Sequence, residues 1–427
     1  MISVGIDISK DKSTVCMLRP YGEVVEAPHD IEHNEQSLNA LIKRIKSFDE
    51  DVKVVLEATG GYHQVVVTKL LEADIFTVVV NPYIMKKYCA AALRKAKTDK
   101  IDSIRIANYG IDRWFSMTAY CPPDEIYAEL KLLGRQYDQY VRLKINCKIQ
   151  LANLLDGVMP GIKTILQGTV PAYSTKDKLC DFVEKYWHYD NIKKMSEKQF
   201  ISDYEKWTKK KGYRYNGSQA IAIYQLSKNN IPTLKSSTPS TKMLVLQAVK
   251  SVKDAEATLS LIISQMQEIA STLPEYSVVR DMKGVGDVLS VRLIAEIGDV
   301  RRFHNGSALV AFAGIDAPPY ESGKFVGTKR NISKRGSATL RKIGYEIMHS
   351  LKVVKPTEDS TNSCVFIMQE SWRFTANFTM LFIYQKQAEK FSFYRLCCYA
   401  LLLVEKNICF FKKGLTNSNR FDVGLCF

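Results

Sequence analysis

An aspartate in the middle of the first predicted strand constrains the fold of this chain more than any other residue. Residues 2–9 alternate apolar and polar side chains, which is the period of a β-strand, and Asp7 lies there between Ile6 and Ile8. A carboxylate on the buried face of a strand costs several kcal/mol unless it is paired with a cation or bound to a metal ion. We therefore expect the N-terminal sheet to contain a charged or metal-binding site as well as a hydrophobic core.

The following segments predict the rest of that sheet. Two runs with the same period, between residues 13 and 27, predict an antiparallel meander with the first strand. After an amphipathic helix, the apolar run 52–57 is typical of a central parallel strand and ends on Glu57. If the first and fourth strands pair in parallel, Asp7 and Glu57 are neighbours. A fifth strand over residues 75–80 precedes a helix that starts near Pro82.

Two further acids lie in the basic segment Lys97-Thr98-Asp99-Lys100-Ile101-Asp102. Positions i and i+3 share one face of a helix, so both carboxylates can point at one place. The alternative is a solvated helix start, with Asp99 near the N-cap. Asp7, Glu57, Asp99 and Asp102 together occupy the positions at which a ribonuclease-H-like sheet gathers its acids. Their oxygens suit a hard divalent ion, and we predict a site for Mg²⁺ or Mn²⁺.

The composition indicates a polyanionic partner. The 427 residues carry a net charge of +15, and nucleic acid is the first candidate, before an anionic membrane surface. A hydrophobic fraction of 46% argues against a disordered basic tail. We expect no signal peptide, because the chain enters a strand directly, and no membrane span. The ten cysteines show no metal-binding spacing, so we expect a reduced, cytoplasmic protein.

The middle of the chain is predicted to be helical. The pattern over residues 124–155 fits a coiled or bundled linker, and its many bases are typical of a solvated helical face. Residues 180–240 interleave lysines with aromatic side chains. These aromatics either stack on single-stranded nucleic acid or pack inside a helical domain. A second long helix is predicted over residues 241–273.

Two later motifs suggest contact with a phosphate backbone. In Met282-Lys283-Gly284-Val285-Gly286, a Gly-x-Gly turn between two helices exposes N–H groups that can hold a phosphate, as in helix-hairpin-helix modules. Ser322 precedes a run, residues 324–342, with seven basic residues and no acidic ones. Ser322 is either a nucleophile beside these cations or part of a plain hairpin turn. The residues predicted to bind nucleic acid are Lys97, Lys100, Lys283, Gly284, Gly286, Lys324, Lys329, Arg330, Lys334 and Arg335.

Several motifs resemble, in the same order along the chain, those of the DEDD transposases of the IS-one-ten insertion sequences. They are Gly5–Lys10, Glu57–Gly60, Lys97–Asp102, Gly284–Gly286, Glu296–Asp299, Phe312–Gly314 and Ile332–Gly336. The resemblance implies a RuvC-like domain whose four acids bind divalent metal and a later serine, best matched by Ser322, that attacks DNA and forms a phosphoserine link. It also implies that members act as homo-oligomers on the ends of their own element, and that a structured guide RNA from the element directs some of them.

The resemblance ends near residue 355. The family usually continues with a basic helix, whereas this tail is rich in aromatic residues and contains five of the ten cysteines, which suggests a shifted reading frame. We predict an α/β RuvC-like domain with a mixed sheet, then a helical linker and a mostly helical transposase domain. The predicted divisions are residues 1–118, 119–275, 276–355 and an atypical tail, 356–427.

The predicted function is that of a bacterial, nucleoid-associated transposase that cuts and rejoins DNA. Its acids are expected to assist Ser322, either in the same chain or from a partner subunit. Two alternatives remain open. One is a metal-dependent nuclease of the Holliday-junction type, which shares the four acids and needs no serine. The other is an inactive nucleic-acid-binding remnant of a decayed element, which the tail favours.

Overall fold

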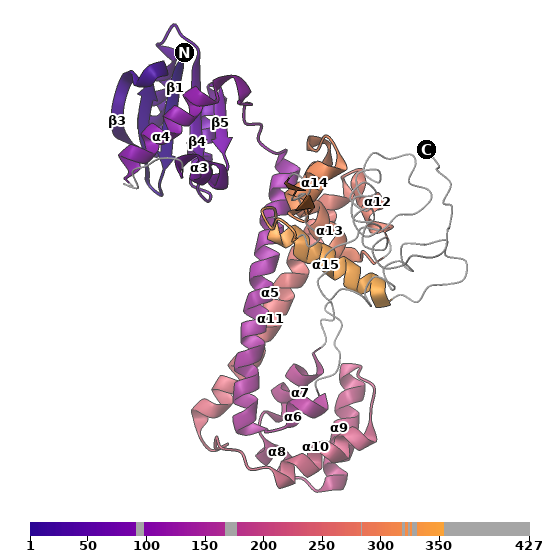
Figure 1. Cartoon of the computed structure of the whole chain (residues 1–427). Coiled ribbons are helices and arrows are strands. Elements are labelled where there is room, and N and C mark those ends of the chain that lie inside the picture. Colours follow the sequence, from indigo (N-terminus) through magenta and orange to yellow (C-terminus); the bar gives the residue numbers. More distant parts are fainter. Residues whose placement is uncertain are drawn as a thin grey trace, which may run out of the picture. The chain divides into compact units, whose positions relative to one another are not determined.

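The computed structural model describes residues 1–90, 98–166, 177–282, 284–317, 321–322, 325–326 and 331–353. The chain divides into two compact units, residues 1–122 and 123–427, and each is described by itself (Figure 1). Lys97, Lys283, Lys324, Lys329, Arg330 and the tail from residue 356 lie outside the described residues.

The first unit is built on a five-stranded mixed sheet with the order β3-β2-β1-β4-β5. The first three strands form an antiparallel meander, and β1, β4 and β5 are parallel. This is the predicted ribonuclease-H-like arrangement, which is confirmed. The strands are β1 (Ile2–Ile8), β2 (Lys12–Leu18), β3 (Val24–Glu32), β4 (Val52–Glu57) and β5 (Thr77–Val80).

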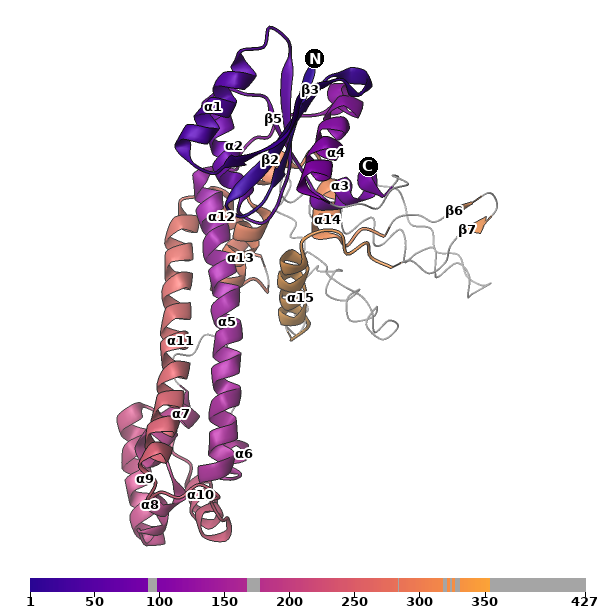
Figure 2. The ribbon, with the colours of Figure 1, turned by 90° about the vertical axis from the view of Figure 1, so that its left-hand side faces the viewer.

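Helices cover both faces of this sheet (Figure 2). One face packs against α1 (Glu35–Lys46) and α2 (His63–Glu72) through a core that includes Ile6 and Leu56. The opposite face packs against α3 (Pro82–Cys89) and α4 (Asp99–Asp112), where Val55, Met85 and Ile106 belong to one buried cluster. Because β1 and β4 are buried on both faces, their apolar residues are almost continuous, as expected for central strands.

The second unit is helical. Two long helices, α5 (Glu125–Val158) and α11 (Pro239–Ser271), lie side by side, as predicted for the linker (Figures 1 and 2). Between them in sequence is a bundle of α6 (Ile162–Leu166), α7 (Lys178–Tyr186), α8 (Tyr189–Lys193), α9 (Glu197–Lys211) and α10 (Gly217–Asn229). After α11 come α12 (Glu275–Arg280), α13 (Asp287–Ile297), η3 (Val300–Arg302), α14 (Gly306–Ala313), β6 (Glu321–Ser322), β7 (Phe325–Val326) and α15 (Ala338–Val353).

The aromatic residues between positions 180 and 240 form the core of the bundle. Tyr189 and Trp207 are buried, and the ring of Trp207 lies 5.8 Å from that of Phe182 and 5.5 Å from that of Tyr204. Of the two alternatives, packing inside a helical domain is correct for the buried rings, which are not exposed for stacking on nucleic acid. Bases and aromatics alternate here because the helices are amphipathic.

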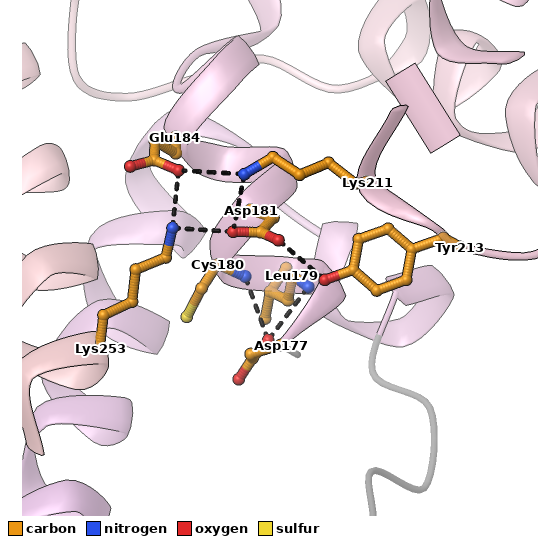
Figure 3. Close-up of polar contacts among 8 residues, drawn as sticks. All are labelled: Asp177, Leu179, Cys180, Asp181, Glu184, Lys211, Tyr213 and Lys253. Atoms are coloured by element: carbon orange, nitrogen blue, oxygen red, sulfur yellow. Dashed lines mark hydrogen bonds and ion pairs between the residues drawn. The ribbon is translucent and has the colours of Figure 1, made fainter. Parts of the chain in front are cut away.

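A polar network fastens this bundle to α11 (Figure 3). The Nζ atom of Lys253 lies 2.7 Å from Asp181 and 2.6 Å from Glu184, and the Tyr213 hydroxyl donates to Asp181 over 2.8 Å. Burial raises the pKa of Asp181, but the bonds from Lys253 and Tyr213 outweigh it and lower the pKa overall. The network therefore stabilises the ionised carboxylate.

Within the described ranges, none of the helices combines the length and the apolar character that crossing a membrane requires.

We predict that Lys253→Met destabilises the second unit by about 1–2 kcal/mol at neutral pH, because a partly buried carboxylate loses its charged partner. The pKa of Asp181 is lower in the folded chain, so this contribution exists above the unfolded pKa and disappears as the pH falls through the folded one. Urea unfolding at pH 7 and pH 3 measures both effects. Lys209→Met, which removes an exposed pair with Glu205, is the matched control and should change little. A difference from wild type that is as large at pH 3 as at pH 7 would contradict the prediction.

Candidate active site

The helix α4 lies directly on β1, because two glycines leave room for it. A Cβ atom on Gly5 would overlap the backbone of Ser103 and Ala107, and one on Gly110 would overlap the side chain of Ser3. The later part of α4 therefore meets the start of β1. It follows that α4 runs antiparallel to β1 and that its first turn lies toward the end of β1 that carries Asp7.

Asp7 and Glu57 point toward the α4 face of the sheet. Ile6 and Leu56 are opposite each other in the parallel pair of β1 and β4, and both pack against α1 and α2 on the other face. Successive side chains of a strand alternate between faces, so the next residue of each strand points toward α4. Those residues are Asp7 and Glu57, and the predicted neighbourhood of the two acids follows from this register.

Asp99 and Asp102 are both in the first turn of α4, on the predicted helix. The N-cap is Thr98, whose hydroxyl accepts from the backbone N–H of Ile101 over 3.3 Å, and Asp99 is the first helical residue and exposed. Asp102 is 21% exposed and lies 3.0 Å from Arg105. The helix-start interpretation and the active-site interpretation are therefore compatible.

The thiol of Cys89, on α3, lies within electrostatic range of both Glu57 and Asp102. Burial raises the pKa of Cys89, Arg105 lowers it, and Asp102 and Glu57 both raise it. Such electrostatic effects act over short distances, so the end of β4 and the start of α4 both lie toward Cys89.

A polar row that was not predicted from the sequence continues across the sheet from Asp7. Thr14 lies opposite Asp7 on β2, and Asp30 lies opposite Thr14 on β3. The Thr14 hydroxyl donates to Asp30 over 2.8 Å, and Lys12 Nζ lies 2.6 Å from the same carboxylate. The predicted third strand ended before Asp30, whereas β3 continues to Glu32. The alternation of residues around Asp30 is the sequence feature that could have predicted the longer strand.

The donor set fits a hard divalent cation, since all four predicted ligands are carboxylates. In the described part of the chain, however, no three side chains of His, Cys, Asp or Glu are gathered closely enough to hold a metal ion. The structure brings the acids to one end of one face without assembling a complete ligand cluster, and the metal site stays a prediction.

We predict that Gly5→Ala lowers the free energy of unfolding by about 1–3 kcal/mol or more, because the added methyl group overlaps backbone atoms of α4 that cannot rotate away. Gly61→Ala is the matched control, since a Cβ atom there meets nothing within 4 Å. Thermal and urea unfolding of the two variants measure the difference. Equal stability of the two variants would show that α4 does not lie this close to β1.

The second candidate site is the hairpin that carries Ser322. β6 and β7 pair antiparallel, with Ser322 opposite Phe325, so the hairpin expected from the dipeptide is present. The flanking segments are joined at Asp316 and Ser333. The Ser333 N–H donates to the Asp316 carbonyl over 2.8 Å, and the Ser333 hydroxyl bonds to the Asp316 carboxylate. We call the β6–β7 hairpin the serine arm, and the pair of Asp316 and Ser333 that flanks it in sequence its base.

The predicted Gly-x-Gly turn joins α12 to α13, as expected. Gly284 has a φ of 78°, and Gly286 is the N-cap of α13, with nothing within 4 Å of the position of a Cβ atom. A ligand can therefore approach the backbone closely at Gly286. Lys334 and Arg335 lie in the loop before α15, and Lys100 lies in the first turn of α4. Phosphate binding by these residues stays a prediction.

A ribonuclease-H-like sheet with acids at one end of β1 and β4 is typical of metal-dependent enzymes that cut nucleic acids. Two family models match the chain. The first, described as "Transposase", covers residues 4–160, and the second, described as "Transposase IS116/IS110/IS902 family", covers residues 276–361. The chain belongs to the IS110/IS116 family of transposases.

The chain is also similar to individual proteins. The chain is 20% identical over 332 residues to the "Insertion element IS116 uncharacterized 44.8 kDa protein" of Streptomyces clavuligerus, which covers 76% of this chain and 78% of that protein. Two structures of RuvC from Thermus thermophilus, one "in complex with Holliday junction substrate", are 11% and 13% identical. Each covers 28% of this chain and 100% of its own, with a TM-score of 0.22.

Proposed function

We propose that this chain cuts and rejoins DNA at the ends of its insertion element, with Asp7, Glu57, Asp99 and Asp102 as metal ligands and Ser322 as nucleophile. The observation that carries the proposal is the placement of the four acids at one end of the α4 face. The register of β1 and β4 and the direction of α4 produce this placement. Its partners would be DNA and a structured guide RNA from the same element, with a homo-oligomer as the acting form.

The acids would hold Mg²⁺ or Mn²⁺. When bound, such an ion supplies Lewis-acid stabilisation of the charge that develops on a phosphodiester. The remaining task of the protein is to position the acids, and α4 does this for Asp99 and Asp102. Arg105 lies 3.0 Å from Asp102 and limits the repulsion among these carboxylates.

Ser322 would form the covalent link. Its Oγ atom bonds to phosphorus while the bond from phosphorus to one deoxyribose oxygen breaks; the serine loses its hydroxyl proton, and the leaving oxygen gains one. A deoxyribose hydroxyl of the strand to be joined then displaces the serine in the reverse exchange. A serine hydroxyl is a weak nucleophile and needs help from a base or a metal ion, which the acids would provide in this reaction.

We predict that Asp7→Asn, Glu57→Gln and Asp102→Asn each lower DNA cleavage roughly 100-fold or more, because each removes charge that the transition state requires. DNA binding should survive, since it depends on Lys and Arg contacts. The matched control is Asp30→Asn, which removes a carboxylate from the same row of the sheet that is bound to Lys12 and Thr14. Cleavage that persists in Asp7→Asn or Asp102→Asn contradicts the assignment.

The serine is tested by trapping protein joined to DNA. We predict that wild type forms an adduct and that Ser322→Ala does not, whereas Ser333→Ala and Ser337→Ala still do. An adduct that persists in Ser322→Ala and maps to Ser333 or Ser337 would show that the wrong serine was chosen. Strand cleavage without any adduct, retained in Ser322→Ala, would identify a junction-type nuclease. DNA binding without cleavage in the presence of Mg²⁺ or Mn²⁺ would identify an inactive remnant.

A further inference from the structure

Three basic side chains lie near one buried carboxylate where α5 meets α13, and one of them, Arg135, forms an ion pair with it. Glu296, on α13, is 5% exposed, and its Oε1 atom lies 3.0 Å from Arg135 Nη2 on α5. Lys131 lies one turn before Arg135, on the same face of α5. Burial lowers the pKa of Lys131, Glu296 raises it, and Arg135 and Arg302 lower it. Lys131 therefore lies within electrostatic range of the other three charges.

The side chain of the third cation, Arg302, is held in place by two aromatic rings and a hydrogen bond. Its guanidinium lies 4.6 Å from the ring centres of both Phe303 and Phe312, and its Nη2 atom donates to the carbonyl of Ile297 over 2.9 Å. Arg302 follows α13, and Phe312 belongs to α14, so this side chain fastens the two helices together. A guanidinium held on aromatic rings has already lost its rotamer freedom and binds an anion at a lower entropic cost.

The cluster has more positive than negative charge. Lys131, Arg135 and Arg302 lie near Glu296, and Arg302 also lies within electrostatic range of Asp299, which is paired with a further cation, Arg301, over 2.9 Å. Further along α5, the lysines are paired with carboxylates. Lys144 lies 3.0 Å from Glu256, and Lys148 lies 3.4 Å from Glu256 and 2.9 Å from Asp177. The excess of positive charge is thus a feature of the first part of α5 and not of the whole helix.

The same carboxylate connects the cluster to Ser337, in the loop that precedes α15. The Ser337 hydroxyl donates to Glu296, and it also accepts from the backbone N–H of Leu340 over 3.1 Å, at the start of α15. The Ser337 N–H donates to the Phe312 carbonyl over 2.8 Å, and Arg135 Nη1 donates to Thr339 Oγ1 over 2.8 Å. Glu296 therefore bonds to the loop, residues 331–337, that follows the serine arm, and Arg135 bonds to the start of α15.

We propose that Lys131, Arg135 and Arg302 form a binding site for a backbone phosphodiester of a nucleic-acid strand, near the start of α15 and the loop that follows the serine arm. This proposal rests on the proposed function, because it assumes that the strand bound here is the one that Ser322 attacks. Glu296 has a positioning role, since it aligns two of the chain's elements without contacting the phosphate. The site reads charge and carries no base specificity.

The experiment measures binding of the full chain to an element-end DNA duplex and to the corresponding RNA, in EDTA, as a function of salt. Each phosphate contact that is removed should lower the slope of log affinity against log salt by about one. We predict this loss for Lys131→Gln and for Arg302→Gln. Lys144→Gln, on the same helix but paired with Glu256, is the matched control and should keep the wild-type slope. Lys131→Arg should keep the slope as well, because it keeps the charge.

The outcomes separate the site from the reaction. A reduced slope on DNA, on RNA or on both supports the site and identifies the strand that it holds. Slopes for Lys131→Gln and Arg302→Gln that match Lys144→Gln overturn it. If Arg302→Gln unfolds at a lower temperature than wild type, Lys131→Gln, which removes no hydrogen bond to Glu296, decides the matter. If wild type forms the adduct at Ser322 but the two variants keep the wild-type salt slope, the phosphate site is wrong and the proposed reaction stands. If the salt slopes fall but no adduct forms, the phosphate site stands and the proposed reaction is wrong.

Discussion

The close contact between α4 and β1 is the constraint on which the first unit depends. A helix that packs on a sheet normally stands off by the length of its side chains, but Gly5 and Gly110 remove them at two points. The backbone of α4 can then rest on the strand, and its first turn reaches the level of Asp7. A larger side chain at either glycine would lift the helix and separate Asp99 and Asp102 from the ends of β1 and β4.

Much of this unit could be predicted from the sequence. The alternation in residues 2–9, the apolar strand that ends on Glu57 and the helix over residues 35–46 gave the strand order and the neighbourhood of Asp7 and Glu57. These sequence patterns are local, but once two adjacent strands pair in parallel, their register determines which of their residues are neighbours in space. The contacts of Asp102 with Arg105 and of Asp30 with Lys12 could not be predicted, because they depend on rotamers and on a strand that continues past its predicted end.

The second unit shows where composition misleads. Lysines interleaved with aromatics occur both in nucleic-acid-binding surfaces and in amphipathic helices of a packed bundle, and only burial distinguishes the two. Tyr204 and Trp207 are buried, while the lysines of α9 face solvent. Conversely, Lys131 and Arg135 are typical of a solvated helix by sequence. Their shared carboxylate, Glu296, is separated from Arg135 by 161 positions, so no local pattern reveals the cluster.

The length of α5 has a geometric consequence for the whole second unit. Its 34 residues extend about 50 Å at a rise of 1.5 Å each, with the bundle near one end and the α13–α15 helices near the other. Each residue also turns the helix by about 100°. Inserting or deleting one residue in its middle would therefore rotate the bundle around the helix axis relative to α13, besides shifting it. A change of seven residues nearly restores the angle, so α5 and α11 would tolerate changes in length most readily in matched steps of two turns.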